Sequence, residues 1–110
     1  MNEKLFKEYE RLRNILKDNL VGIDIINNEV IVYVKNKVSI QGYKVLDPID
    51  YIKDQITSAI GNLVRNIEVK DDVIEVHVKD YTPQMFELIS VIEYETNKKF
   101  NTRLTVRVLS

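Results

Sequence analysis

The chain contains no cysteine among its 110 residues. This absence excludes disulfides, thiolate metal sites, cysteine-bound iron–sulfur clusters and cysteine nucleophiles. Small secreted domains usually depend on disulfides, so we expect a cytoplasmic protein. Residues 1–6 lack the long apolar segment of a signal peptide, and the apolar runs elsewhere are too short to span a membrane.

An excess of charge of one sign is also missing. The chain has 16 basic and 17 acidic residues and a formal net charge of -1, which gives no long-range attraction for phosphate backbones or anionic membranes. Its three glycines, Gly22, Gly42 and Gly61, are far apart, so they do not form a glycine-rich phosphate-binding loop. A composition that is 45% hydrophobic and 30% charged is typical of a globular protein.

Apolar periodicity predicts three helices. The first covers residues 3–19, where Leu5, Tyr9, Leu12 and Leu16 form one stripe. The second covers residues 48–63 and begins at Asp47-Pro48, and the third begins at Thr82-Pro83. In both pairs a capping side chain precedes a proline at the first helical position. The third helix is expected to end at 97–99.

Alternating apolar residues predict two hairpins, at 20–35 and 64–79, with turns at Asn27-Asn28 and Asp71-Asp72. We expect a further strand at 38–40 and a last strand at 103–108. The predicted fold is a single α+β domain over residues 1–110, in the order α-β-β-(β)-α-β-β-α-β. Three helices would lie mostly on one face of an antiparallel or mixed sheet of five to six strands.

The two halves of this order resemble each other. Residues 23–35 align with 67–79 without a gap, and each helix before a hairpin ends in Asn-Leu-Val. One interpretation is an internal duplication of an αββ segment, at 3–35 and 48–79. The other is that any amphipathic helix before a hairpin gives a similar pattern.

Residues 20–68 resemble the small iron–sulfur assembly domain of bacterial and cytosolic maturation factors. The likeness lies in a helix and hairpin before a second helix, 50–56, that leads into a strand at 64–69. That family has a cysteine before the second helix, where this chain has Leu46-Asp47-Pro48. The resemblance therefore implies a cysteine-free scaffold without the cluster chemistry. The helix–strand–strand order is also similar to ring-building domains of secretion machines, and fold likeness does not transfer function.

The residues offer little catalytic chemistry. His77 is the single histidine and stands between Glu75 and Lys79 on the predicted solvent face of a strand. A general base needs an orienting partner and a pocket, so we interpret His77 as a solvated cross-strand neighbour. Asp47, Asp50 and Asp54 gather at a helix start, where the helix dipole explains acidic residues without a metal. We therefore predict no enzyme activity, no cofactor, and no catalytic or metal site.

A nucleic-acid-binding accessory protein is one alternative. The predicted solvent face of the sheet would carry five basic side chains: Lys70, His77, Lys79, Arg103 and Arg107. Tyr33 or Tyr81 could stack on bases. Glu68 and Glu75 share that face, however, which also suits an ordinary solvated surface with cross-strand ion pairs.

The favoured prediction is a non-enzymatic protein-interaction module that forms a homodimer. Apolar residues are in excess on the first hairpin, at Ile31 and Tyr33, and on the third helix, at Phe86, Val91 and Tyr94. Exposed apolar surface of this kind marks interfaces, and a two-fold dimer is its commonest solution. Two alternatives remain: the segment 36–46 covers the first hairpin, or an enzyme site forms between two chains.

Overall fold

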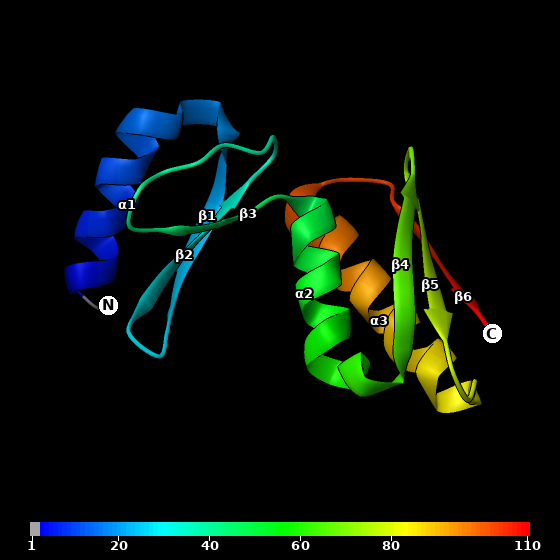
Figure 1. Ribbon diagram of the computed structural model, residues 1–110. Helices are drawn as coiled ribbons and strands as arrows, with labels where there is room; N and C mark the ends of the chain where they lie inside the picture. Colours follow the sequence, from blue (N-terminus) through cyan, green and yellow to red (C-terminus); the bar gives the residue numbers. More distant parts are fainter. Residues whose placement is uncertain (1–2) are drawn as a thin grey trace. The chain divides into compact units, whose positions relative to one another are not determined.

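The computed structural model describes residues 3–110, and these residues form three α-helices and six β-strands (Figure 1). The predicted α+β class and element order are confirmed, with the strands divided between two three-stranded mixed sheets. The chain divides into two compact units, an N-terminal unit that ends at Pro48 and a C-terminal unit that begins at Ile49. In chain order the elements are α1 (Glu3–Leu16), the 3₁₀ turn η1 (Lys17–Asn19), β1 (Leu20–Ile26), β2 (Glu29–Val34), β3 (Lys44–Leu46), α2 (Pro48–Ile60), the 3₁₀ turn η2 (Gly61–Leu63), β4 (Val64–Lys70), β5 (Val73–Val78), α3 (Pro83–Phe100) and β6 (Thr105–Leu109).

The N-terminal unit is a helix, a hairpin and a third strand in the order β1-β2-β3. The hairpin turns at Asn27 and Asn28, whose φ angles of 51° and 65° are positive, a conformation that asparagine tolerates. This confirms the predicted turn. Helix α1 packs against one face of the sheet through Leu12, which is fully buried.

The third strand of this unit differs from the prediction. The strand expected at 38–40 is wrong, because the structure places β3 at Lys44–Leu46, parallel to β2. A parallel neighbour requires the chain to cross back to the starting end of the sheet, and residues 35–43 make that crossover. Val38 and Ile40 therefore pack on the core of the unit and do not join the sheet.

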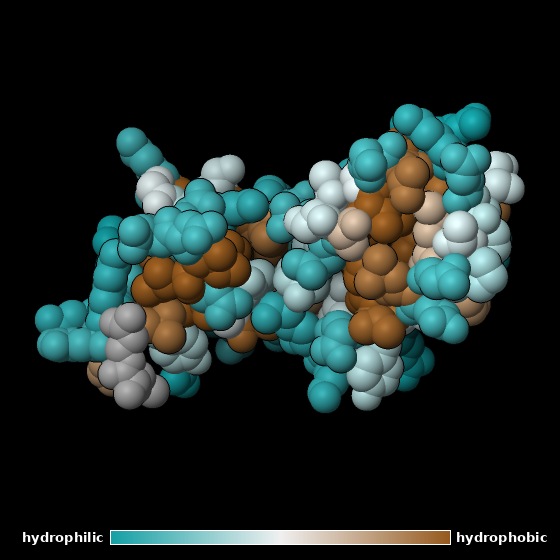
Figure 2. Space-filling model, turned by 90° about the horizontal axis from the view of Figure 1, so that it is seen from below, coloured by the Kyte–Doolittle hydropathy of each residue, from teal (hydrophilic) through white to brown (hydrophobic). Residues whose placement is uncertain are grey.

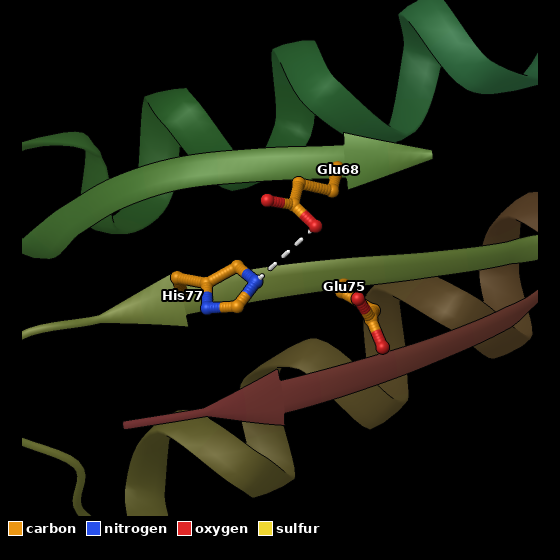
Figure 3. A group of neighbouring side chains, drawn as sticks. All are labelled: Glu68, Glu75 and His77. Atoms are coloured by element: carbon orange, nitrogen blue, oxygen red, sulfur yellow. Dashed lines mark ion pairs between the residues drawn. The ribbon is translucent and has the colours of Figure 1, made fainter. Parts of the chain in front are cut away.

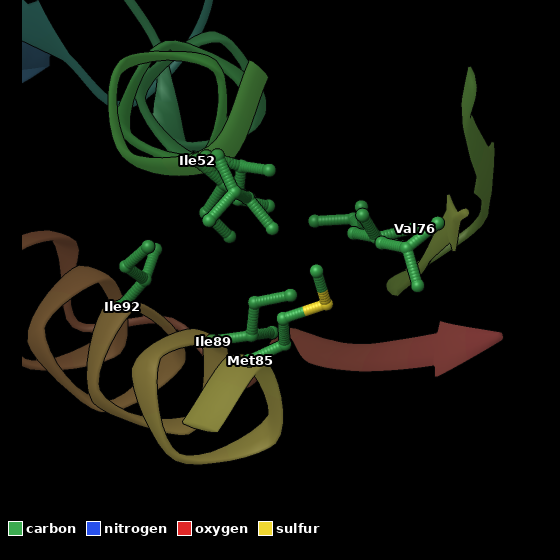
Figure 4. Close-up of a cluster of buried hydrophobic side chains, with 9 residues drawn as sticks. Ile52, Val76, Met85, Ile89 and Ile92 are labelled. Atoms are coloured by element: carbon green, nitrogen blue, oxygen red, sulfur yellow. The ribbon is translucent and has the colours of Figure 1, made fainter. Parts of the chain in front are cut away.

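The C-terminal unit has the sheet order β4-β5-β6, and its crossover between parallel strands is a full helix, α3. Helices α2 and α3 cover the same face of the sheet (Figure 1), and their apolar side chains meet those of β5 (Figure 4). This core consists of nine buried residues: Ile52, Ile56, Ile60, Ile74, Val76, Val78, Met85, Ile89 and Ile92.

Helix α3 begins where the sequence predicts. Thr82 is its N-cap, and its hydroxyl accepts a hydrogen bond of 3.2 Å from the backbone N–H of Met85. The helix extends to Phe100, slightly beyond the expected end, because Asn101 provides the left-handed C-cap with a φ of 55°.

The two units share one strand framework. In each hairpin the pair farthest from the turn, Leu20 with Val34 and Val64 with Val78, is followed by a bulge at the next residue of the first strand. In each unit the third strand then joins the second strand in parallel. The gap-free sequence alignment of the hairpins thus coincides with equivalent structural positions. Gene duplication, and the treatment of 1–110 as one domain, stay predictions.

Among the described residues, no helix is long and apolar enough to cross a membrane.

Candidate functional site

An apolar groove lies between α2 and α3 in the C-terminal unit. Its volume is about 300 Å³, and it is open to solvent. Helix α2 contributes side chains at successive turns, with Ala59, the single alanine of the chain, as the smallest. The seven lining residues are Tyr51, Gln55, Ala59, Leu88, Val91, Ile92 and Glu95. A small residue between larger ones leaves a hollow that a side chain from another surface can fill.

The solvent side of α3 carries large apolar residues, and one of them, Val91, also lines this groove. Phe86, Val91 and Tyr94 are exposed, Val91 by 57%, so three of the five predicted interface residues lie on accessible surface. Figure 2 shows hydrophobic side chains, in brown, that reach the surface of each unit between polar ones. Exposed apolar area that is rimmed by polar residues is typical of a contact surface.

The other two predicted interface residues are on β2. Ile31 and Tyr33 are buried, with 7% and 4% exposure. The Tyr33 hydroxyl donates a hydrogen bond of 2.7 Å to the Asp24 carboxylate on β1. The residues predicted for self-association therefore divide between a buried strand and an exposed helix, and α3 is the accessible part.

The face of the β4-β5-β6 sheet that is opposite the helices is charged. Because side chains alternate along strands, the residues between Ile74, Val76 and Val78 point away from the core. The strand register places Glu68 beside Glu75, and Glu75 beside Arg107. Like charges on directly opposite residues destabilise a sheet, so the Glu68–Glu75 pair needs compensation.

Lys70 provides part of this compensation. Its ammonium lies 3.0 Å from a Glu75 carboxylate oxygen and 3.8 Å from one of Glu68. The hydrogen bond to Glu75 is the main cause that raises the pKa of Lys70 above its ordinary value. The Lys70 side chain of this ion pair is mostly exposed, and ion pairs with an exposed partner contribute little stability.

His77 completes the charged cluster. Its Nε2 lies 3.8 Å from a Glu68 oxygen, beyond hydrogen-bond distance (Figure 3). Nε2 is buried and has no hydrogen-bond partner within residues 3–110. One donor atom each from Glu68, Glu75 and His77 lies within 4.8 Å of the others. The cluster therefore has two carboxylates and one unused imidazole nitrogen on one sheet face, which is a set of donors that suits a divalent metal ion.

The five residues predicted to contact nucleic acid do not form one basic face. Lys70, His77 and Arg107 lie on the charged sheet face, next to the two glutamates. Lys79 follows the end of β5, and Arg103 is exposed in the segment before β6. Of the two tyrosines considered for stacking, Tyr33 is buried and Tyr81 is exposed.

The outer edge of the sheet is covered where β6 begins. Glu93 accepts a hydrogen bond of 2.7 Å from the Val106 N–H, and Asn97 binds both the N–H and the carbonyl of Leu104. Both side chains come from α3, one turn apart. Paired edges of this kind discourage strand-to-strand association with another chain.

Sequence reasoning missed two of these features. The groove side of α2 carries Tyr51, Gln55 and Ala59 at intervals of four residues, a spacing that marks one helix face. The Glu68–Glu75–His77 cluster follows from the hairpin turn, since the turn sets which residues pair across the strands. Both signals were therefore present in the sequence.

Comparison with protein families, curated proteins and solved structures finds no match for this chain.

Proposed function

We propose that this chain is a non-enzymatic protein-interaction module that self-associates through α3. The observation that carries the proposal is an exposed stripe on this helix, formed by Glu87, Val91, Tyr94 and Lys98. Its spacings of four, three and four residues are those that bring side chains together along a helix seam. We call it the α3 stripe.

The α3 stripe is complementary to itself. It begins with an acidic residue and ends with a basic one, with two apolar residues between them. When two copies pack antiparallel across a two-fold axis, Val91 faces Tyr94 of the second copy. Glu87 then faces Lys98 of the second copy, so an apolar centre is closed at both ends by opposite charges. This charge pattern favours a second copy of this chain as the occupant of the surface.

Neighbouring features support the same surface. The Lys98 ammonium already lies 6.0 Å from the centre of the Tyr94 ring, which orients both side chains on the stripe. Val91 also lines the α2–α3 groove, so a side chain from a second copy could enter the groove beside the stripe. His77, the single histidine, lies on the opposite face of the sheet, so the groove contains no histidine base.

The test is the mass in solution of the full chain, by size-exclusion chromatography with light scattering. We expect a dimer for the natural chain and a monomer for Val91→Glu or Tyr94→Glu, because each glutamate would be desolvated against an apolar partner. That change should raise the dissociation constant about tenfold or more. The control is Ile15→Glu on α1, where the exposed fraction of 56% matches the 57% of Val91. This control should remain dimeric.

A charge exchange sharpens the test. Glu87→Lys alone should weaken the dimer through like-charge repulsion, and Glu87→Lys with Lys98→Glu should restore it. A monomeric natural chain overturns the proposal, as does a dimer that Val91→Glu and Tyr94→Glu leave intact. With six tyrosines and no tryptophan, the protein absorbs weakly, so bound nucleic acid would be evident at 260 nm. A salt-sensitive 260 nm signal would favour the nucleic-acid alternative instead.

A further inference from the structure

We propose that Glu68, Glu75 and His77 form a binding site for a zinc-class divalent metal ion. The site lies on the sheet face of the C-terminal unit opposite α2 and α3, so it is independent of the α3 stripe. Figure 3 shows the three side chains on the same face, Glu68 from β4 and Glu75 and His77 from β5, with the imidazole directed toward Glu68. We call these three residues the sheet-face triad.

The strands fix the geometry of the triad. Glu75 and His77 are two residues apart on β5, so both side chains point to the same face. Glu68 is directly opposite Glu75 on the neighbouring strand. The donor atoms lie within 4.8 Å of one another. Around zinc, with bonds of about 2.0–2.2 Å, donor atoms are roughly 3.3 Å apart. Rotation of the two glutamate side chains that moves their oxygens by about an ångström would bring the three donors to that spacing.

The state of His77 points to a ligand. A buried imidazole nitrogen without a hydrogen-bond partner costs free energy, and such groups in native proteins need an explanation. A metal ion uses that nitrogen's lone pair and neutralises the two facing carboxylates. One histidine nitrogen and two carboxylate oxygens are three of the four ligands of a zinc site, and they leave one position for water.

The N-terminal unit provides an internal comparison. Asp24 and Tyr33 occupy the places that Glu68 and His77 occupy in the C-terminal unit, since the register pairs and bulges of the two hairpins coincide. There the tyrosine hydroxyl donates directly to the carboxylate, at 2.7 Å. In the C-terminal unit the equivalent pair is 3.8 Å apart and makes no hydrogen bond. The two side chains at this pair of positions are thus joined by a hydrogen bond in the N-terminal unit, and in the C-terminal unit they are not.

Lys70 is the competitor of the metal. Its ammonium lies 3.0 Å from Glu75, where it balances part of the negative charge. The Lys70 side chain is mostly exposed, so it can turn into solvent when an ion enters. Removal of this lysine should therefore strengthen metal binding, which is the opposite of what loss of an ordinary stabilising contact would do.

The test is a titration of the full chain with zinc chloride, monitored by NMR of the imidazole ring. His77 is the single histidine, so its ring signals identify the site without further assignment. We expect saturable shifts of the ring nitrogen signals with one equivalent of zinc. Glu68→Gln and Glu75→Gln keep the side-chain size and should each weaken binding about tenfold or more. Lys70→Met should strengthen it.

The matched control is Glu29→Gln, an exposed strand carboxylate in the other unit, which should leave the titration unchanged. Calorimetry of the same variants gives a second readout that does not depend on the ring signals. Absence of a saturable His77 shift overturns the proposal. The proposal is also overturned if neither Glu68→Gln nor Glu75→Gln weakens zinc binding, because the histidine alone would then bind the ion.

Discussion

The two units of this chain have the same strand framework and different crossovers. Each has a helix, a 3₁₀ turn, a bulged hairpin and a third strand parallel to the second. Between the parallel strands the N-terminal unit has the irregular segment 35–43, and the C-terminal unit has the long helix α3. The same arrangement of three strands therefore forms with either kind of crossover. The core and the exposed surfaces, by contrast, differ with the crossover.

The cores differ accordingly. In the C-terminal unit α2 and α3 each contribute buried residues to one cluster. In the N-terminal unit, Leu12 is the one buried residue of α1 (Glu3–Leu16). Val38, Ile40 and Tyr43 of the crossover pack against this core, and each is only partly buried. Fewer buried apolar side chains provide less stabilisation, so we expect the N-terminal unit to open more readily.

The largest expected effect comes from equivalent core residues. Leu12 on α1 and Ile56 on α2 are both fully buried, and each belongs to the core of its own unit. Substitution of either by alanine should lower the free energy of unfolding by about 2–5 kcal/mol, through lost burial and the remaining cavity. Hydrogen exchange measured by mass spectrometry should place each loss in the unit that carries the change.

The control for this pair is Ile15→Ala on α1, where the side chain is mostly exposed and the loss should be small. If Leu12→Ala lowers protection equally in both units, they unfold as one cooperative domain. The comparison between two separately stable units would then fail, and the single-domain prediction from the sequence would gain support.

A smaller effect concerns the outer edge of each third strand. In the C-terminal unit Asn97 holds Leu104 through two backbone hydrogen bonds. In the N-terminal unit Lys37, from the irregular crossover, donates one hydrogen bond of 2.8 Å to the Val45 carbonyl on β3. Asn97→Ala should cost about 1–3 kcal/mol, because two partly buried backbone groups of Leu104 lose their partner. Lys37→Met should cost less, since water can replace this hydrogen bond to the Val45 carbonyl.

Urea unfolding of the two variants, with hydrogen exchange to locate the change, measures this difference. Equal losses, or a larger one for Lys37→Met, would show that the kind of crossover does not decide how firmly the third strand is held. Increased aggregation of Asn97→Ala alone would agree with its role at the sheet edge.

The sequence predicted most of the fold because local signals determine most of it. Thr82-Pro83 marks the start of α3, and Asn27-Asn28 fixes the first hairpin, since both depend on backbone chemistry within a few residues. The prediction of a strand at 38–40 was wrong because its alternating residues, Val38 and Ile40, pack against the core of the N-terminal unit from an irregular segment. Apolar alternation over three residues does not distinguish a strand from a crossover that packs two side chains.

The candidate sites were less predictable, because they depend on which residues pair across strands and helices. Ile31 and Phe86 have similar apolar character, yet one is buried in a strand and the other is exposed on a helix. Nothing in a single strand's pattern shows whether its second face is covered. His77 has a solvent-facing position, as predicted, but its buried nitrogen and its approach to Glu68 arise from the hairpin register.

The smallest expected effect is a difference between the two units in how their stability depends on pH. Glu8 on α1 accepts a hydrogen bond from the Tyr43 hydroxyl in the irregular crossover, whereas Ile52, fully buried, faces the core from α2 in the other unit. This hydrogen bond is the main cause that raises the pKa of Tyr43 above its ordinary value of 10.0. A raised pKa in the folded state stabilises the protein fully below pH 10.0, and this contribution is lost as the pH rises through the folded-state pKa.

We therefore expect alkaline pH to weaken the N-terminal unit first. Urea unfolding followed by hydrogen exchange from pH 8 to 11 should show a modest loss of protection around Tyr43, since one partly exposed hydroxyl is involved. Tyr43→Phe removes the titrating group and should flatten this dependence in the N-terminal unit alone, at the cost of one hydrogen bond at every pH. A pH dependence that persists unchanged in Tyr43→Phe would assign the alkaline loss to other groups. The hydrogen bond between Glu8 and Tyr43 would then hold the crossover against α1 without making stability depend on pH, as the apolar packing of α3 does in the other unit.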